Sequence, residues 1–364
     1  MTIRIGVVGG GLVAQAMHIP NLAARPDRFR LAALAEPSET VRTVLAARYG
    51  IGGLHTDYRG LLDGGGLDAV LIASPAGTHA EVVLAALEAG LHVFVEKPMC
   101  ITLSDADAII AARDRTARVV QVGTMKRFDP AVERMLAELP GSAAGVRYVS
   151  VVVNDPEFVP FFEAGDIVRG TDVPGEVIAA TREAEAAQVE AAVGSGHPDV
   201  VRAFSESFLG SLLHDLNVVH GVLEQMGEPL PADVVAGDWW NEGRAVTGSL
   251  RLANGARCDG AWIGLHDTFE YHETISFFFA DSVRTLSFPS PWLRNSPTVY
   301  RRSEADGRAN SVHSLTSHAE SFMRELEHFH DCIVAGTRCR TPPEQARLDI
   351  DVLTRMFLAS DRTA

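Results

Sequence analysis

The chain opens with an apolar run that leads into a glycine-rich turn, IRIGVVGGGLVA at residues 3–14. An apolar run without polar alternation is typical of a strand buried on both faces. The turn matches the pattern G-x-G-x-x-G/A between a strand and a helix. Gly9 permits the tight turn, Gly11 lets the backbone approach a pyrophosphate, and Ala14 allows close packing of helix on strand. The alternative is an ordinary glycine-rich turn. The predicted cofactor contacts here are Gly9, Gly11, Leu12 and Val13.

The rest of the first third of the chain repeats this alternation of apolar runs and helix-like stretches. The further runs lie at 31–35, 69–73, 92–95 and 119–122, and helical spacing is evident at 79–88 and 104–115. Strands that alternate with helices predict a parallel, doubly wound α/β sheet. We therefore expect a Rossmann domain that binds NAD(P) over residues 1–124.

A different pattern begins after residue 124. A helix is expected at 130–139 and a strand at 146–153, and five extended segments with glycine turns follow between 233 and 288. Strands without intervening helices predict an open, largely antiparallel sheet. Helices are expected at 317–334 and 343–360. Residues 125–364 are thus predicted to form a second α/β domain for substrate binding and oligomerisation.

One segment of this second part is unusual. Residues 155–205 contain ten acidic and three basic residues, so they carry −7 of the formal net charge of −15. The Ala/Glu-rich stretch 176–193 predicts a helix that Gly194 can end. We interpret 155–205 as a helical insertion, either a lid that closes on substrate or a subunit contact or solvated surface.

Composition excludes several classes of function. With 364 residues, 46% of them hydrophobic, the chain is long enough for about two folded domains. Its acidity disfavours nucleic-acid binding. No apolar run reaches the roughly 18 residues of a membrane span, and no signal peptide is evident, so the cytoplasm is the expected location. The four cysteines are scattered without a CxxC pair, and we predict no metal site.

The end of the second predicted strand bears on cofactor choice. Glu36 can accept both ribose hydroxyls of NAD and would repel a 2′-phosphate. Ser38 and Arg42 nearby could soften that discrimination. NAD is therefore the expected cofactor, and NADP stays open.

Several motifs together resemble the Gfo/Idh/MocA family, named for glucose–fructose oxidoreductase, inositol dehydrogenase and a rhizopine-catabolism protein. They are SPAGTH at 74–79, EKP at 96–98, QVG at 121–123 and RFDP at 127–130. The resemblance implies a Rossmann domain followed by an α/β domain with an open sheet. It also implies an NAD(P)-dependent dehydrogenase or reductase acting on CH–OH groups of a sugar, sugar derivative or cyclitol, often as a homodimer or homotetramer.

The resemblance assigns roles to individual residues. Lys97 would bond the reacting oxygen and Glu96 would line the nicotinamide, and His214 matches the family's catalytic histidine. Gly210 stands where the family has an aspartate, so Lys97 and His214 are expected to act as the acid/base pair. The other implied cofactor contacts are Ser74, Pro75 and His79, and the candidate substrate contacts are Arg127, Asn154, Asp155 and Asn217.

Two other functions remain open at this point. A tightly held NAD could be recycled while the enzyme eliminates or hydrolyses a bond beside a transient carbonyl. Alternatively, the chain could be a non-catalytic NAD(P)-binding protein. A dehydrogenase consumes NAD stoichiometrically, whereas an enzyme that recycles its NAD does not. Turnover of any polyol excludes a non-catalytic binding protein.

Overall fold

The computed structural model describes residues 1–142, 145–156, 167–265, 268–293 and 296–360. The chain divides into two compact units. The first unit contains residues 1–124, the described part of 162–188, and 322–347, and the second contains the remainder. Part of the expected insertion and one of the expected C-terminal helices thus belong to the first unit. Residues 157–166 of the expected insertion lie outside the described residues.

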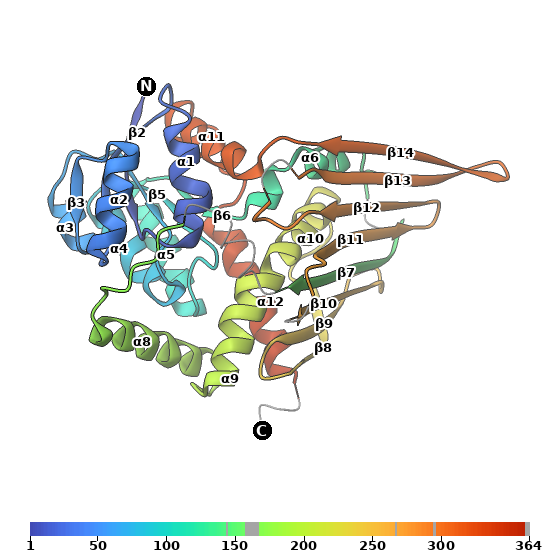
Figure 1. Cartoon of the computed structure of the whole chain (residues 1–364). Helices are drawn as coiled ribbons and strands as arrows, with labels where there is room; N and C mark the ends of the chain where they lie inside the picture. Colours follow the sequence, from blue (N-terminus) through green and yellow to red (C-terminus); the bar gives the residue numbers. More distant parts are fainter. Residues whose placement is uncertain (143–144, 157–166, 266–267, 294–295, 361–364) are drawn as a thin grey trace. The chain divides into compact units, whose positions relative to one another are not determined.

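A six-stranded parallel sheet forms the centre of the first unit (Figure 1). The strand order is β3-β2-β1-β4-β5-β6. Successive strands are therefore added first on one side of β1 and then on the other, as in a doubly wound sheet. The strands are β1 (Ile3–Val8), β2 (Phe29–Ala35), β3 (Gly53–His55), β4 (Ala69–Ile72), β5 (His92–Glu96) and β6 (Val120–Gly123). This confirms the predicted fold class of the N-terminal part.

Helices of the first unit begin and end at residues with a clear local cause. Ser38 caps α2 by accepting a hydrogen bond from the Val41 N–H, and Gly50 ends that helix at a φ of 68°. Thr102 caps α5 in the same way. The helices that follow the strands are α1 (Ile19–Ala23), α2 (Glu39–Tyr49), α3 (Tyr58–Asp63), α4 (His79–Glu88) and α5 (Leu103–Thr116). The segment from Ala14 to His18, before α1, is a π-helix.

Later parts of the chain complete the first unit. Helix α11 (Ser321–Val334) contributes Leu326 and Phe329 to the core formed by β1, β2 and β4. The connection after α11 lies against β6, where Thr341 Oγ1 donates to the Val122 carbonyl at 2.8 Å. Helix α8 (Gly175–Val193) confirms the helix predicted from its Ala/Glu-rich sequence, and Gly194 follows it at a φ of 87°.

The second unit is built on an eight-stranded sheet of order β14-β13-β12-β11-β7-β10-β9-β8. All neighbouring pairs are antiparallel except β7 and β10, which are parallel. The largely antiparallel sheet is therefore confirmed. Its strands are β7 (Val146–Pro156), β8 (Asp233–Trp240), β9 (Ala245–Arg251), β10 (Arg257–Leu265), β11 (His272–Phe279), β12 (Ser282–Phe288), β13 (Thr298–Asp306) and β14 (Ala309–Ser317).

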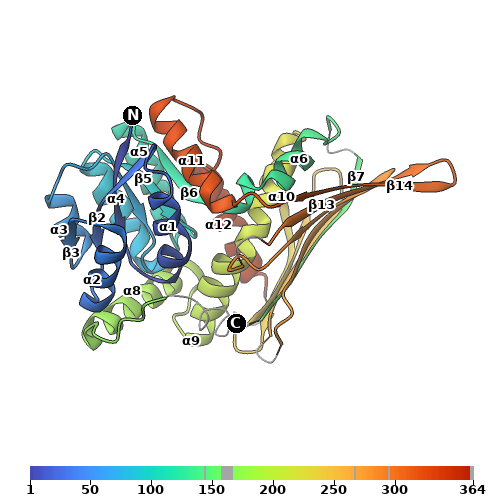
Figure 2. The same ribbon diagram turned by 45° about the horizontal axis from the view of Figure 1, so that its top comes forward.

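Helices of the second unit cover one face of its sheet, and the other face carries none of the described helices of that unit (Figure 2). Side chains of β11 alternate between buried and half-buried along that strand, as expected for a sheet with two different faces. The helices are α6 (Pro130–Ala137), α9 (Pro198–Val201), α10 (Leu213–Gln225) and most of α12 (Pro343–Leu358), with a π-helix from Arg202 to Leu212.

Elements that the sequence analysis did not predict include β3, α3, β13 and β14. Strand β14 is exposed along almost its whole length, so its sequence lacks the apolar alternation that marks a half-buried strand. Because β14 extends to Ser317, helix α11 begins at Ser321, later than expected. Among the described helices, none is both long and apolar enough to span a membrane.

Candidate functional site

The glycine turn after β1 has the geometry of a nucleotide-binding turn. Gly9 has a φ of 96°, and a Cβ there would lie 2.6 Å from the Ala73 carbonyl oxygen, so only glycine fits. A Cβ at Gly11 would meet no atom within 4 Å. The space beside Gly11 is therefore open to a ligand, at the start of a helix whose N–H groups favour phosphate. Leu12 and Val13 follow at this helix start and are half-buried.

Glu36 at the end of β2 accepts two backbone hydrogen bonds. Its Oε2 receives the Gly10 N–H at 2.7 Å, and its Oε1 receives the Ser38 N–H at 2.9 Å. The carboxylate is thereby fixed beside the glycine turn. Arg42, which sequence reasoning considered for a 2′-phosphate, instead donates to the Glu36 carbonyl oxygen at 2.5 Å.

Residues 167–173 of the expected insertion cross this same site, and we call them the strap. The side chain of Gln15 accepts from the Val168 N–H at 2.9 Å and donates to the Val168 carbonyl at 3.0 Å. Gly170 packs against Ser38 so closely that a Cβ would lie 2.2 Å from the Ser38 hydroxyl. Between the strap and the glycine turn lies a cavity of about 420 Å³. Its lining includes Gly10, Gly11, Leu12, Glu36, Val168 and Arg169.

These observations test whether the site fits a dinucleotide. The residues present offer a turn without side chains, an open helix start and a fixed carboxylate around one cavity of ligand size. Such a site suits the pyrophosphate and ribose of NAD(P). The strap was not predicted as part of it, because polar contacts between residues 15 and 168 leave no local sequence pattern.

His79 joins two loops at the carboxyl ends of β4 and β5. Its Nε2 lies 2.7 Å from the Ser74 carbonyl oxygen and its Nδ1 lies 2.8 Å from that of Pro98. Burial lowers the pKa of the imidazole. The side chain is almost fully buried and holds the two loops together. Ser74 and Pro75 precede it at the end of β4, and the Ser74 hydroxyl bonds to Thr78.

Glu96 is buried and paired with His18, a residue that sequence reasoning missed. His18 Nε2 lies 2.6 Å from Glu96 Oε1, and Glu325 from α11 is close to both. Burial opposes ionisation of Glu96, but the hydrogen bond from His18 together with the charges of His18, Lys97 and His79 outweighs it and lowers the pKa of the carboxyl. The available signal was a histidine between two apolar residues, Met17 and Ile19, shortly after the glycine turn. The pair fixes the residue next to Lys97.

Lys97 follows β5 directly and is half-buried. Burial lowers the pKa of its ammonium group from 10.5, and Glu96 only partly opposes the shift. A lysine with a lowered pKa can exchange a proton nearer to neutral pH. The chain has one other lysine, Lys126, so amine chemistry is confined to these two side chains and the amino terminus.

His214 lies in the second unit, half-buried in the first turn of α10. The helix before it is a π-helix from Arg202 to Leu212, which contains Gly210. A π-helix has more residues per turn than an α-helix, and residues four apart, such as Gly210 and His214, still lie close to one face of it.

Arg127 and Asn217 hold the interior of the second unit together. Arg127 donates to the Asn217 carbonyl oxygen at 3.2 Å and packs against Gly221, where a Cβ would lie 2.2 Å from the guanidinium carbon. The Asn217 amide donates to Asp349 at 2.6 Å, and His220 shares that carboxylate. Both candidate substrate residues are buried and hydrogen-bonded within the second unit, and their contact with a substrate stays a prediction.

A buried charge cluster lies near the remaining candidates. Lys126 Nζ is 3.2 Å from Asp215 Oδ1 and also pairs with Glu273, to which the Tyr271 hydroxyl donates. Burial raises the pKa of Asp215, and Lys126 opposes this shift. Burial, with the charges of Asp215 and Asp155, raises the pKa of Tyr271 well above its ordinary value.

Asn154 and Asp155 end the long strand β7 and are half-buried. Asn154 pairs in register with His272 of β11, so this end of the sheet carries several polar groups. The influence of Asp155 on Tyr271 shows that the carboxylate is near the phenol. These two residues stay candidates for polar contacts with a substrate.

The fold and the glycine turn define the class of the N-terminal part. Residues 3–124 match the model of an oxidoreductase family with an NAD-binding Rossmann fold, GFO_IDH_MocA. Over these residues the chain is similar to the Gfo/Idh/MocA family, and the resemblance stated from the motifs is confirmed for this part.

Curated relatives are similar over part of their length. An inositol 2-dehydrogenase of Saccharopolyspora erythraea is 34% identical over 175 residues, which is 48% of this chain and 51% of the relative. An NAD(+)-dependent scyllo-inositol 2-dehydrogenase of Bacillus subtilis is 33% identical over 129 residues, 35% of this chain and 37% of the relative. The chain thus spans about half the length of the first relative, and less of the second.

Solved structures extend the similarity of fold to the whole chain. A UDP-N-acetylglucosamine 3-dehydrogenase of Acidithiobacillus ferrooxidans superposes with a TM-score of 0.72 at 19% identity, covering 100% of this chain and 99% of its own. A 3-ketoreductase of Actinomadura kijaniata, in complex with NADP and TDP-benzene, gives 0.74 at 17% identity and covers 99% and 98%. At these identities the likeness concerns the fold.

Proposed function

We propose that the protein is an NAD(P)-dependent oxidoreductase that interconverts a secondary alcohol and a ketone on a sugar, sugar derivative or cyclitol. The observation that carries the proposal is Lys97, an amine of lowered pKa that follows β5 in the unit containing the nucleotide turn. Ligands of doubly wound sheets bind at the carboxyl ends of the strands. The inositol dehydrogenases among the relatives support the class of substrate.

The chemistry requires a hydride partner and a group that moves one proton. The bound nicotinamide supplies the hydride acceptor or donor. In the oxidative direction, the neutral amine of Lys97 takes the hydroxyl proton as the C–H hydride leaves, and in reduction the ammonium returns it. We assign His214 as the second member of the acid/base pair, on its match to the family histidine. Glu96, held by His18, positions Lys97.

A screen tests this function. Inositols, free sugars and nucleotide sugars are incubated with NAD or NADP at alkaline pH, and the absorbance of reduced nicotinamide is followed. We expect stoichiometric reduction with at least one polyol. Lys97→Met should lower kcat by roughly 10²–10⁴-fold with cofactor Kd retained. Turnover of an identified substrate at the wild-type rate by Lys97→Met would refute the assignment.

The two lysines permit a second test that needs no substrate. An amine-acetylating reagent is applied with and without NAD, and modification is measured by peptide mass spectrometry. We expect NAD to protect Lys97. Lys126, buried in its ion cluster, serves as the internal control and should react slowly in both samples. Equal labelling of Lys97 with saturating NAD would argue against a site beside the nicotinamide.

We also propose that the protein works as a homodimer or homotetramer through the helix-free face of the second unit's sheet. Exposed apolar side chains such as Val152 and Val235 support this proposal. Light scattering of the purified chain measures the oligomer, and Val152→Glu should shift it toward monomer. A cytoplasmic location stays part of the proposal, to be checked by cell fractionation.

A further inference from the structure

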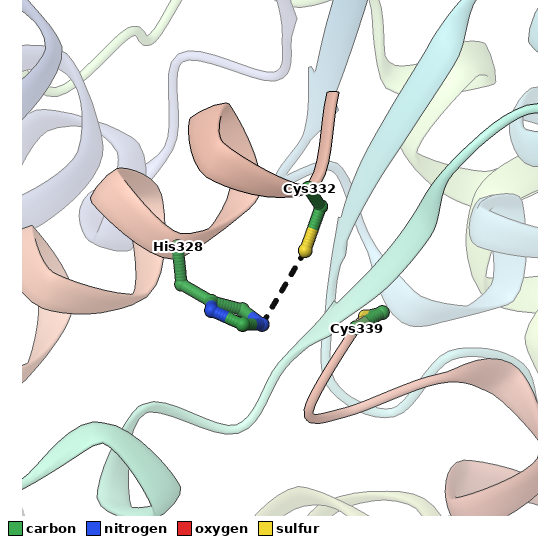
Figure 3. A group of neighbouring side chains, drawn as sticks. All are labelled: His328, Cys332 and Cys339. Atoms are coloured by element: carbon green, nitrogen blue, oxygen red, sulfur yellow. Dashed lines mark hydrogen bonds between the residues drawn. The ribbon is translucent and has the colours of Figure 1, made fainter. Parts of the chain in front are cut away.

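Two cysteines and a histidine converge at the end of α11, in the first unit (Figure 3). His328 and Cys332 are four residues apart on the helix and therefore share one face. Cys332 Sγ lies 3.4 Å from His328 Nε2. Cys339, on the connection after the helix, brings its sulfur within 4.8 Å of both ligand atoms.

We propose that His328, Cys332 and Cys339 bind a thiophilic divalent metal ion of the Zn²⁺ class. Imidazole and thiolate are the ligands that such ions prefer, and three of them with a solvent molecule make a tetrahedral site. Cys332 is 4% exposed, so the ion would be largely enclosed. The spacing H-x3-C-x6-C contains no CxxC pair, the cysteine pattern that most directly marks a metal site in a sequence.

The surroundings favour metal binding. The two sulfur atoms and His328 Nε2 lie close enough for one ion to contact all three, and each cysteine would bind as the thiolate after losing its proton. The Arg340 N–H points into the cluster and donates to His328 Nε2 at 3.0 Å. Once Nε2 binds the ion, this N–H can donate to a metal-bound thiolate instead.

The position of the cluster indicates a structural role. Strand β6 is the edge of the parallel sheet, and residues 339–341 lie along it. Cys339 Sγ is 3.6 Å from the Val120 carbonyl oxygen, and the Val122 N–H donates to the Thr341 carbonyl at 3.0 Å. A metal ion would attach residues 339–341 to α11. An ion that binds the folded state and not the unfolded state stabilises the fold.

Cobalt substitution tests the proposal. The full chain is reduced, stripped with a chelator and titrated with Co²⁺. We expect one ion per chain, with thiolate charge-transfer bands, loss of the bands on adding Zn²⁺, and a higher Tm with Zn²⁺. Cys332→Ser and Cys339→Ser should lose the charge-transfer bands, and Cys100→Ser, which alters another buried cysteine, should keep them.

Three results would overturn it. They are the absence of Co²⁺ uptake by the reduced wild-type protein, bands that persist in both Cys332→Ser and Cys339→Ser, and a Cys332–Cys339 disulfide in protein that takes up no ion after reduction. Because His328→Gln removes one ligand without touching a thiol, retention of charge-transfer bands with weaker binding in that variant would support the assignment.

A second and independent observation concerns Asp172 of the strap. Its Oδ1 accepts from the Ser38 hydroxyl at 2.5 Å, and its Oδ2 accepts from the Thr40 N–H at 2.9 Å and the Thr40 hydroxyl at 3.1 Å. These donors stand at the start of α2, directly after Glu36. They are the kind of donors that bind an anion at a helix N-terminus.

We infer that Asp172 acts as an internal anion that excludes the 2′-phosphate of NADP, an inference that rests on the proposed function. The carboxylate occupies the hydroxyl and N–H groups nearest to the ribose-binding Glu36, and adds a second negative charge there. Hydrogen bonds from Ser38 and Thr40 lower the pKa of Asp172 to about 2, so the side chain is charged at neutral pH. The insertion would thus make the site selective for NAD.

The test is the ratio of dissociation constants for NADPH and NADH, measured by calorimetry. We expect wild-type protein to prefer NADH and Asp172→Asn to lower the ratio by about tenfold or more, as removal of one like charge near a phosphate predicts. Glu176→Gln, an exposed acidic residue at the start of α8, is the matched control. A ratio unchanged by Asp172→Asn, or a wild-type preference for NADPH, would overturn the inference. Failure to bind either cofactor would count against the proposed function itself.

Discussion

The side chain of Gln15 binds both polar groups of the Val168 main chain, at 2.9 and 3.0 Å. One amide thereby joins the helix after the nucleotide turn to a segment 153 residues later. Through this contact, the strap of the acidic insertion forms one wall of the cavity beside the glycine turn. It also explains why Gln15 is buried within the first unit.

Replacing Gln15 with Met should release the strap. Two hydrogen bonds of about 1 kcal/mol each are lost, so the detached population should rise roughly thirtyfold. Limited proteolysis within 167–173 measures this rise. The protease is kept dilute, so that opening and closing of the strap are fast relative to cleavage and the rate follows the detached population. Gln225→Met, at an exposed position of α10, is the matched control. Equal cleavage of both variants would mean that the strap is held by other contacts.

The glycine turn makes opposite predictions at two positions. Gly9→Ala forces a residue with a φ of 96° and a Cβ 2.6 Å from the Ala73 oxygen, so it should lower the free energy of unfolding by about 2 kcal/mol or more. Gly11→Ala meets no protein atom and should fold normally, yet weaken NAD binding by filling the ligand's space. Denaturant unfolding and calorimetry separate the two. Equal stability losses would contradict the assignment of the open side of the turn.

The lowered pKa of Lys97 predicts the pH dependence of the reaction. The amine must be neutral to accept a proton, so kcat/KM for alcohol oxidation should rise with pH and level off above an apparent pKa below 10.5. In Lys97→Arg the side chain stays positively charged at every accessible pH and cannot accept a proton. The variant should therefore be inactive and show no rise of kcat/KM with pH. A wild-type limb centred at or above 10.5 would exclude the buried amine as the base.

The pair of His18 and Glu96 predicts a pH dependence of stability. Glu96 has a lowered pKa in the folded state, so its contribution is fully present above 4.5 and is lost as pH falls through the folded value. His18→Leu leaves the carboxylate buried without this partner and should cost about 3 kcal/mol at neutral pH. The loss of stability on acidification should shrink in the variant. Denaturant titrations at several pH values measure both effects, and unchanged stability at neutral pH would refute the pairing.

Removal of the second lysine tests the charge cluster of the second unit. Lys126→Met leaves Asp215 and Glu273 buried without their cation, and should lower the free energy of unfolding by about 3 kcal/mol or more. The double variant Lys126→Met/Glu273→Gln should recover part of the loss, because one unpaired charge is gone. Calorimetric unfolding of both variants checks that the double variant is more stable than the single variant. Equal loss in the two would show that the charges do not interact.

The sequence determined the features that depend on neighbouring residues. Apolar runs and helical spacing predicted most of the strands and helices, because burial repeats with the period of the backbone. The glycine turn and Glu36 were found because each belongs to a local pattern with a stereochemical cause, and the EKP stretch was found by its resemblance to a family motif. The exposed hairpin of β13 and β14 was missed because exposed strands need no apolar alternation.

Tertiary structure decided which distant polar groups meet. The strap on Gln15, the approach of Cys339 to His328 and the pairing of Lys126 with Glu273 each join residues whose separation in sequence carries no period. The same holds for Arg127 and Asn217, whose hydrogen bonds to buried partners of the second unit leave no local sequence pattern. A polar side chain has the same local sequence whether it faces a ligand or a buried partner. Its use is fixed only when the fold brings that partner within hydrogen-bonding distance.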